Sequence, residues 1–147
     1  MMKLPEEVKI VEVGPRDGFQ SIKEWIPTKD KMEIIECLIN SNIKKIEVTS
    51  FVHPKAIPQM QDAQEIVTKV LALGKDIELN ALVPNLTGAK AAWEAGIKEV
   101  TFVISASEKH NLENVRRTKE ESFAELMAIK EQLPDLKVGV RGTEHLT

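Results

Sequence analysis

The sequence of 147 residues has little cysteine, few aromatic residues and no long apolar run. A single cysteine, Cys37, excludes a disulfide framework within the chain and a cysteine-rich zinc site. No apolar run approaches the roughly 20 residues needed to span a bilayer, and the first residues lack the apolar core of a signal peptide. The formal net charge is only −3, which gives no basis for binding nucleic acid. We therefore expect a cytoplasmic protein with no membrane partner and no nucleic acid partner.

The composition that remains is typical of a folded domain. Hydrophobic residues make up 42% of the chain and charged residues 29%, which excludes a disordered or fibrous protein. The length corresponds to one ordinary domain. We therefore treat residues 1–147 as a single domain.

Short runs rich in valine and isoleucine alternate with helix-like segments along the chain. The expected strands cover 8–13, 44–49, 77–83, 98–104 and 136–140, and the expected helices cover 28–41, 61–73, 86–95 and 119–132. This alternation predicts an α/β fold with a parallel sheet, either an open doubly wound sheet or the N-terminal part of a (β/α)₈ TIM barrel. No glycine-rich nucleotide-binding motif follows the first strand, which removes the main support for a nucleotide site. Cys37 falls in the first helix, where we expect packing rather than reactivity.

Polar side chains follow the first four expected strands, whereas the fifth delivers none. Ligands of parallel α/β proteins bind at the carboxyl ends of the strands. The residues at these ends are Arg16, Asp17 and Gln20, then Glu47, Thr49, Ser50 and His53, then Asn85, and finally Ser105, Ser107 and Glu108. Glu47 lies between Ile46 and Val48, so it faces the opposite side of its strand. Inside a barrel its carboxylate would need Arg16 or a metal ion as partner, and the alternative is a solvated residue on an edge strand.

Two further segments have two readings each. In the turn at 14–18, Asp17 could hold a hard metal ion and Arg16 could neutralise a bound oxygen, or the pair could simply cap a surface turn. The polar stretch at 109–118 could be a solvated loop. Alternatively, Asn111, Asn114, Arg116 and Arg117 could face an anionic substrate.

The segment Gly14-Pro15-Arg16-Asp17-Gly18-Phe19-Gln20 resembles the signature of the 3-hydroxy-3-methylglutaryl-CoA lyase family, and segments 46–52, 83–86, 105–108 and 140–142 are similar to it in the same order. The resemblance implies a metal-dependent (β/α)₈ barrel that makes or breaks carbon–carbon bonds next to a thioester. It implies that Asp17 binds Mg²⁺ or Mn²⁺ and that Arg16 and Glu47 are catalytic. The acyl-CoA substrate would be contacted by Gln20, Ser50, His53, Asn85, Ser107 and Asn114.

The resemblance also predicts an incomplete enzyme. Such barrels need about 250 residues, and this sequence stops after its fifth strand. The family's His-x-His metal ligands, metal-binding asparagine and acid/base cysteine have no counterpart, and His145 stands alone. We therefore expect a truncated lyase that binds metal weakly, is inactive by itself and forms homo-oligomers through its open sheet edges. A related isopropylmalate or homocitrate synthase and a non-catalytic interaction module remain alternatives.

Overall fold

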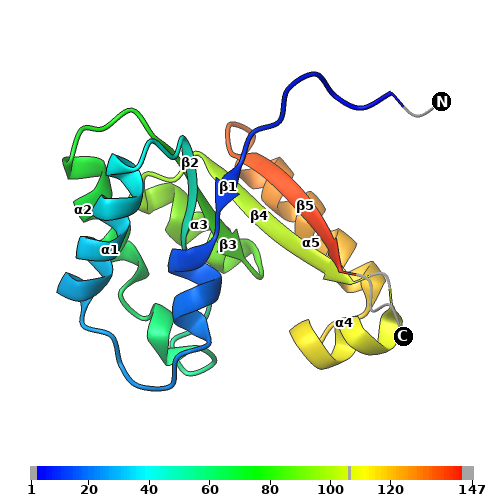
Figure 1. Cartoon of the computed structure of the whole chain (residues 1–147). Helices are drawn as coiled ribbons and strands as arrows, with labels where there is room; N and C mark the ends of the chain where they lie inside the picture. Colours follow the sequence, from blue (N-terminus) through cyan, green and yellow to red (C-terminus); the bar gives the residue numbers. More distant parts are fainter. Residues whose placement is uncertain (1–2, 106, 144–147) are drawn as a thin grey trace.

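The computed structural model describes residues 3–105 and 107–143 and contains one parallel sheet of five strands (Figure 1). The strands are β1 (Val11–Glu12), β2 (Lys45–Ser50), β3 (Glu78–Val83), β4 (Glu99–Ser105) and β5 (Lys137–Thr143). The α-helices are α1 (Thr28–Asn40), α2 (Ala63–Ala72), α3 (Leu86–Ala95), α4 (Glu108–Val115) and α5 (Lys119–Gln132). Two short helical turns, η1 (Gly14–Gly18) and η2 (Pro58–Met60), complete the description.

The strands follow one another in the sheet in the order in which they occur along the chain. A doubly wound sheet reverses its strand order at a switch point, so the sequential order excludes that alternative. Each strand pairs in parallel with the next, and the helices between strands cover the outside of an open half-barrel. In Figure 1, α1 and α2 lie beside each other on the β2 side, and α5 runs alongside β5. The predicted partial TIM barrel is confirmed.

Aliphatic side chains of the strands and the helices meet in one core. Ile35 of α1, Val67 of α2 and Ile129 of α5 are fully buried, together with Ile46 of β2 and Val100 of β4. Burying an aliphatic side chain of this size contributes about 1.5–3 kcal/mol. The core therefore holds the helices against the sheet and fixes the positions of the strand ends.

Two expected elements differ from the structure. The first strand is limited to Val11 and Glu12, because Val11 pairs with the first residue of β2 and residues further upstream have no partner strand. No helix was expected in the stretch at 109–118, for which a solvated loop was one of two readings, but most of it lies in α4. Periodicity could not predict this helix, because it has no apolar stripe; the buried Asn111 anchors it instead.

The prediction that Cys37 packs inside the protein is wrong, because the residue is exposed. It lies two positions after the buried Ile35 and therefore on the opposite face of α1. Within the described ranges, no helix is both long and apolar enough to cross a membrane.

Candidate functional site

The turn η1 fixes the backbone of Arg16 at the carboxyl end of β1. The backbone N–H groups of Arg16 and Asp17 both donate to the Val13 carbonyl, at 3.1 and 2.7 Å. The Glu12 carboxylate accepts the Gly14 N–H at 2.7 Å, and a Cβ on Gly14 would lie 2.8 Å from the same oxygen. A side chain at position 14 would therefore displace the Glu12 carboxylate and break its hydrogen bond to the Gly14 N–H. Local helical irregularities of this π type occur frequently at functional sites.

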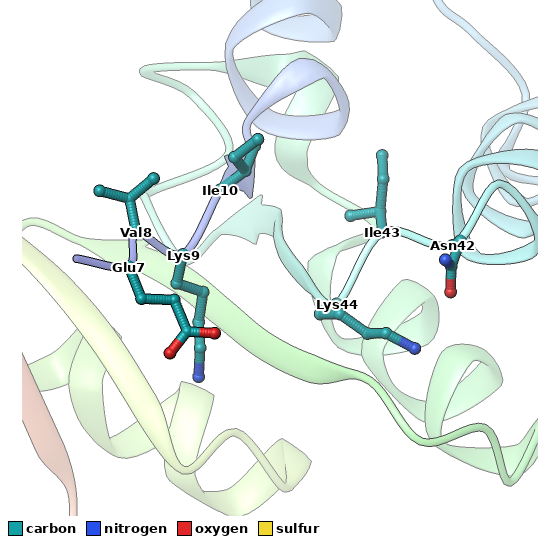
Figure 2. A pocket seen from close by; sticks show the side chains of 7 residues that line it. All are labelled: Glu7, Val8, Lys9, Ile10, Asn42, Ile43 and Lys44. Atoms are coloured by element: carbon teal, nitrogen blue, oxygen red, sulfur yellow. The ribbon is translucent and has the colours of Figure 1, made fainter.

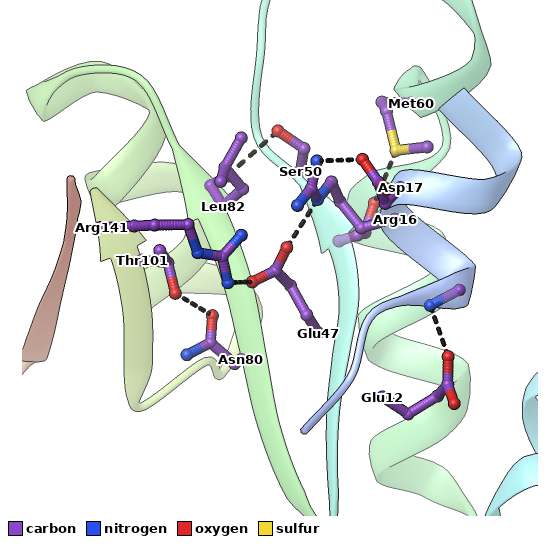
Figure 3. Close-up of polar contacts among 12 residues, drawn as sticks. Glu12, Arg16, Asp17, Glu47, Ser50, Met60, Asn80, Leu82, Thr101 and Arg141 are labelled. Carbon is purple, nitrogen blue, oxygen red and sulfur yellow. Dashed lines mark hydrogen bonds and ion pairs between the residues drawn. The ribbon is translucent and has the colours of Figure 1, made fainter. Parts of the chain in front are cut away.

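The Arg16 side chain forms a buried ion pair with Glu47 of β2 (Figure 3). Arg16 Nε lies 2.5 Å from Glu47 Oε1, and Arg16 Nη1 lies 3.0 Å from Asp17 Oδ1. Glu47 is fully buried, and the Arg16 side chain is 11% exposed. Isolated charges would be costly at this depth, so the pairing is what allows both to be buried. The sequence-based expectation that Glu47 faces the barrel interior and meets Arg16 is confirmed.

A second guanidinium group, from β5, contacts the other oxygen of Glu47. Arg141 Nη2 donates to Glu47 Oε2 at 3.0 Å, so Glu47 lies between two arginines (Figure 3). The expectation that the fifth strand delivers no polar group was therefore wrong. That strand was expected to stop at Val140, whereas β5 continues to Thr143 and includes Arg141. An arginine directly after a Val-rich strand is the signal that could have identified it.

Both guanidinium groups line a cavity of about 290 Å³ at the carboxyl ends of the strands. Gln20 is the other side chain in its lining that ends in a polar group. The apolar residues of the lining are Val52, Ile57, Leu82, Val83, Pro84, Val103 and Val115. A cavity that combines two cationic groups with apolar walls suits a small ligand with an anionic group and an aliphatic body.

A cavity of about 580 Å³ lies at the opposite ends of the strands, between residues 7–10 and 42–44 (Figure 2). Lys9, one of its lining residues, forms a 2.7 Å ion pair with Glu78. Barrel enzymes carry their chemistry at the carboxyl ends of the strands and their stabilising residues at the amino ends. The smaller cavity beside Arg16 is therefore the candidate site.

Several residues expected near the substrate have local partners in the structure. The Ser50 hydroxyl donates to the Leu82 carbonyl at 3.2 Å, and the Asn85 side chain caps α3 by accepting the Gly88 N–H at 2.8 Å. The exposed His53 accepts the Lys55 N–H through Nδ1 at 3.1 Å. Of the predicted substrate-binding residues that the structure describes, only Gln20 lines the cavity.

The remaining candidate residues are Ser107, Asn114 and His145. Ser107 is exposed just before α4, and its contact with a substrate remains a prediction. Asn114 belongs to α4, but its side chain lies outside the described part of the structure, as does His145.

In the 109–118 stretch, Asn111 and Arg117 form hydrogen bonds within the protein, whereas Arg116 is exposed to solvent. The Asn111 amide donates to the Arg117 carbonyl at 2.8 Å and to the Ser122 hydroxyl at 2.9 Å, and its oxygen accepts the Ser105 N–H. Arg117 Nη2 donates to the Pro84 carbonyl at 2.7 Å, whereas Arg116 is exposed. Asn111 and Arg117 therefore fasten α4 to the strand ends.

The described residues do not by themselves fit a Mg²⁺ or Mn²⁺ site. The Asp17 side chain is 66% exposed and already accepts from Arg16, and both oxygens of Glu47 contact arginines. Across residues 3–105 and 107–143, no three His, Cys, Asp or Glu side chains form a group that could hold a metal ion. Mg²⁺ requires near-octahedral coordination, and Asp17 supplies a single carboxylate to it.

Comparisons with known proteins show which proteins this chain resembles. The hydroxymethylglutaryl-CoA lyase of Bacillus subtilis is 46% identical over 122 residues, which are 83% of this chain and 40% of the relative. The mitochondrial hydroxymethylglutaryl-CoA lyase of Arabidopsis thaliana is 44% identical over 139 residues, which are 95% of this chain and 30% of the relative. The chain thus spans less than half the length of these relatives.

Solved structures show the same similarity in three dimensions. The HMG-CoA lyase of Acinetobacter baumannii, in complex with coenzyme A and 3-methylmalate, has a TM-score of 0.84 and 39% identity. The similarity covers 97% of this chain and 47% of the solved one. A family model described as HMGL-like matches residues 7–141, a range that includes η1, Glu47 and Arg141. The chain therefore belongs to the HMGL-like family.

Proposed function

We propose that this chain carries the oxyanion-stabilising part of a hydroxymethylglutaryl-CoA lyase site. The reaction is the retro-Claisen cleavage of 3-hydroxy-3-methylglutaryl-CoA to acetyl-CoA and acetoacetate. The observation that carries the proposal is the buried ion pair of Arg16 and Glu47 beside the 290 Å³ cavity. The similarity to lyases, one of them solved with coenzyme A, supports an acyl-CoA as the substrate.

The cleavage requires positive charge at the thioester oxygen. A base removes the proton of the tertiary hydroxyl, and the ketone of acetoacetate forms while the neighbouring carbon–carbon bond breaks. The electron pair of that bond goes to the thioester unit, which becomes the enolate of acetyl-CoA and then takes up a proton at carbon to give acetyl-CoA. Arg16 is suited to stabilise the enolate oxygen, because Glu47 and the η1 backbone fix it before the ligand binds. Groups fixed in this way need little reorganisation during the reaction.

Asp17 is the proposed ligand for a divalent cation, and we expect weak binding because it is a single exposed carboxylate. No step above depends on that metal. We also propose that residues 1–147 form one partial barrel domain. A cytoplasmic location remains a prediction from the sequence, and some relatives are mitochondrial enzymes.

The open sheet supports self-association as a further part of the proposal. Strands β1 and β5 are the edges of the sheet. Val140 on β5 is 53% exposed, and Phe123 and Met127, one turn apart on α5, are 55% and 63% exposed. Unpaired edges with exposed apolar residues favour pairing with another chain. Light scattering should show an oligomer that Val140→Lys converts to monomer, and a monomer at high concentration would contradict this part.

Acetoacetate formation tests the lyase proposal. The chain is incubated with 3-hydroxy-3-methylglutaryl-CoA and Mg²⁺ or Mn²⁺, alone and with the remaining part of the Bacillus subtilis lyase. We expect no product from the chain alone and measurable product from the mixture. Arg16→Gln should reduce that rate by about 10²–10³, as loss of an oxyanion donor does. Lys90→Gln, which removes an exposed cation on α3, is the matched control. If the two pieces associate but form no product, the chain is an interaction module and the lyase proposal is wrong.

A further inference from the structure

The proposed function gives Arg16 a role and leaves Arg141 at the same cavity without one. Arg141 Nη2 contacts Glu47 Oε2 at 3.0 Å, and within the described residues this is its one polar contact. The Arg141 side chain is 42% exposed, compared with 11% for Arg16. The Nε and Nη1 hydrogens of Arg141 can therefore donate to a ligand in the cavity.

We propose that Arg141 binds a free carboxylate on the acyl group and so determines specificity for dicarboxylic acyl chains. The inference rests on the proposed function, which assigns the thioester end of the ligand to Arg16. Glu47 separates the two tasks, because each of its oxygens holds one guanidinium group. A guanidinium presents its donors in a planar fork that matches a carboxylate.

The walls of the cavity define the rest of the ligand. Leu82, Val103 and Val115 line it together with Arg141 and offer apolar contact to an aliphatic chain. Its volume of about 290 Å³ is near the lower end of small-molecule pockets. The acyl chain is therefore short, with the thioester near Arg16 and the carboxylate near Arg141.

Two matched ligands test the inference on the unchanged protein. 3-Hydroxy-3-methylglutaryl-CoA carries the free carboxylate, and 3-hydroxy-3-methylbutyryl-CoA lacks it. We expect 3-hydroxy-3-methylglutaryl-CoA to bind about 10- to 100-fold more tightly, which is the range of one charge-assisted hydrogen bond. It should also shift the Nε–Hε NMR signals of Arg16 and Arg141. Equal affinity for the two ligands would overturn the inference.

The arginine signals also separate failure of the inference from failure of the proposed function. If the dicarboxylic thioester shifts the Arg16 signal but leaves Arg141 unchanged, only the inference is wrong. If neither signal moves, both are wrong.

Substitution of Arg141 provides the second test. Arg141→Gln should reduce the preference for the dicarboxylic ligand to about onefold, whereas Lys90→Gln, with the same charge change, should preserve it. Because Arg141 contacts a buried carboxylate, circular dichroism must show that the variant is folded. If the glutamine variant unfolds, Arg141→Lys replaces it in the test, because it keeps a cation beside Glu47. The lysine variant lacks the planar fork of donors and should therefore lose most of the preference for the dicarboxylic ligand. A folded variant of either kind that keeps the full preference would overturn the inference.

Discussion

Replacing Glu47 with glutamine removes the negative charge that both Arg16 and Arg141 contact. Glutamine preserves the shape of the side chain, but its NH₂ group would place donors opposite one of the two guanidinium groups. Arg141 is half-exposed and can turn toward water, whereas Arg16 is 11% exposed and would remain buried without its main counter-charge. Breaking one partner of a buried ion pair costs about 3–5 kcal/mol. Because domains have a total stability of about 5–15 kcal/mol, this loss would be large.

Urea unfolding, followed by the fluorescence of Trp25 and Trp93, measures the change in the free energy of unfolding. The control is Glu65→Gln, which breaks an exposed pair with Lys69 at 3.3 Å and should cost about 0.3–0.5 kcal/mol. Both variants remove one carboxylate charge, so they differ mainly in the burial of the pair. If the loss in Glu47→Gln does not exceed that of the control, the reasoning about the buried pair is wrong.

Three further predictions concern the rest of the fold. Lys31→Met should lower the free energy of unfolding in urea by about 3–5 kcal/mol. Lys31 contacts the nearly buried Asp62 carboxylate at 2.9 Å, and the substitution would leave that carboxylate without its cation. A smaller loss than in Glu65→Gln would contradict this prediction. Gly88→Ala should cost about 1–3 kcal/mol, because the new Cβ would clash with the Phe51 carbonyl oxygen. The control is Gly142→Ala, whose Cβ would meet no atom of the described residues within 4 Å, and equal unfolding midpoints for the two variants would contradict the prediction. The hydrogen bond from Lys9 lowers the pKa of the Glu78 carboxyl, so its stabilising contribution is complete above the ordinary carboxyl pKa and is lost as the pH falls through the lowered value. The stability difference between the protein and Glu78→Gln should therefore vanish in acid, and a difference that grows in acid would contradict the assignment.

The strands and the central ion pair could be predicted because they depend on simple periodicity. The strands β2, β3 and β4 carry Val, Ile, Leu or Phe at short spacing between clear breaks, and their expected bounds agree with the structure within about a residue. Glu47 lies between Ile46 and Val48, and a charge in that position needs a buried partner if it faces the interior of a barrel. Its contact with Arg16 follows from the parallel order of the strands.

The predictions that differ from the structure concern polar side chains whose partners are set by local hydrogen bonds. Ser50 and Asn85 lie at strand ends, as expected of ligand-binding residues, but their side chains satisfy nearby backbone groups. The sequence alone does not distinguish these two uses of a polar side chain. Arg141 was not assigned a role because the carboxyl end of β5 depends on pairing with β4, where Arg141 lies opposite Val103. That pairing is a tertiary feature, and the one local signal is the arginine that directly follows the Val-rich segment.

Arg16 and Glu47 are hydrogen-bonded inside the half-barrel before any ligand binds. The most direct measurement is the NMR scalar coupling across the hydrogen bond from Arg16 Nε to the Glu47 carboxylate carbon in the ligand-free protein. The 2.5 Å separation of Nε and Oε1 predicts an observable correlation and slow solvent exchange of the Arg16 Hε proton. No correlation, together with Arg16 exchange as fast as that of the exposed Arg116, would contradict the account.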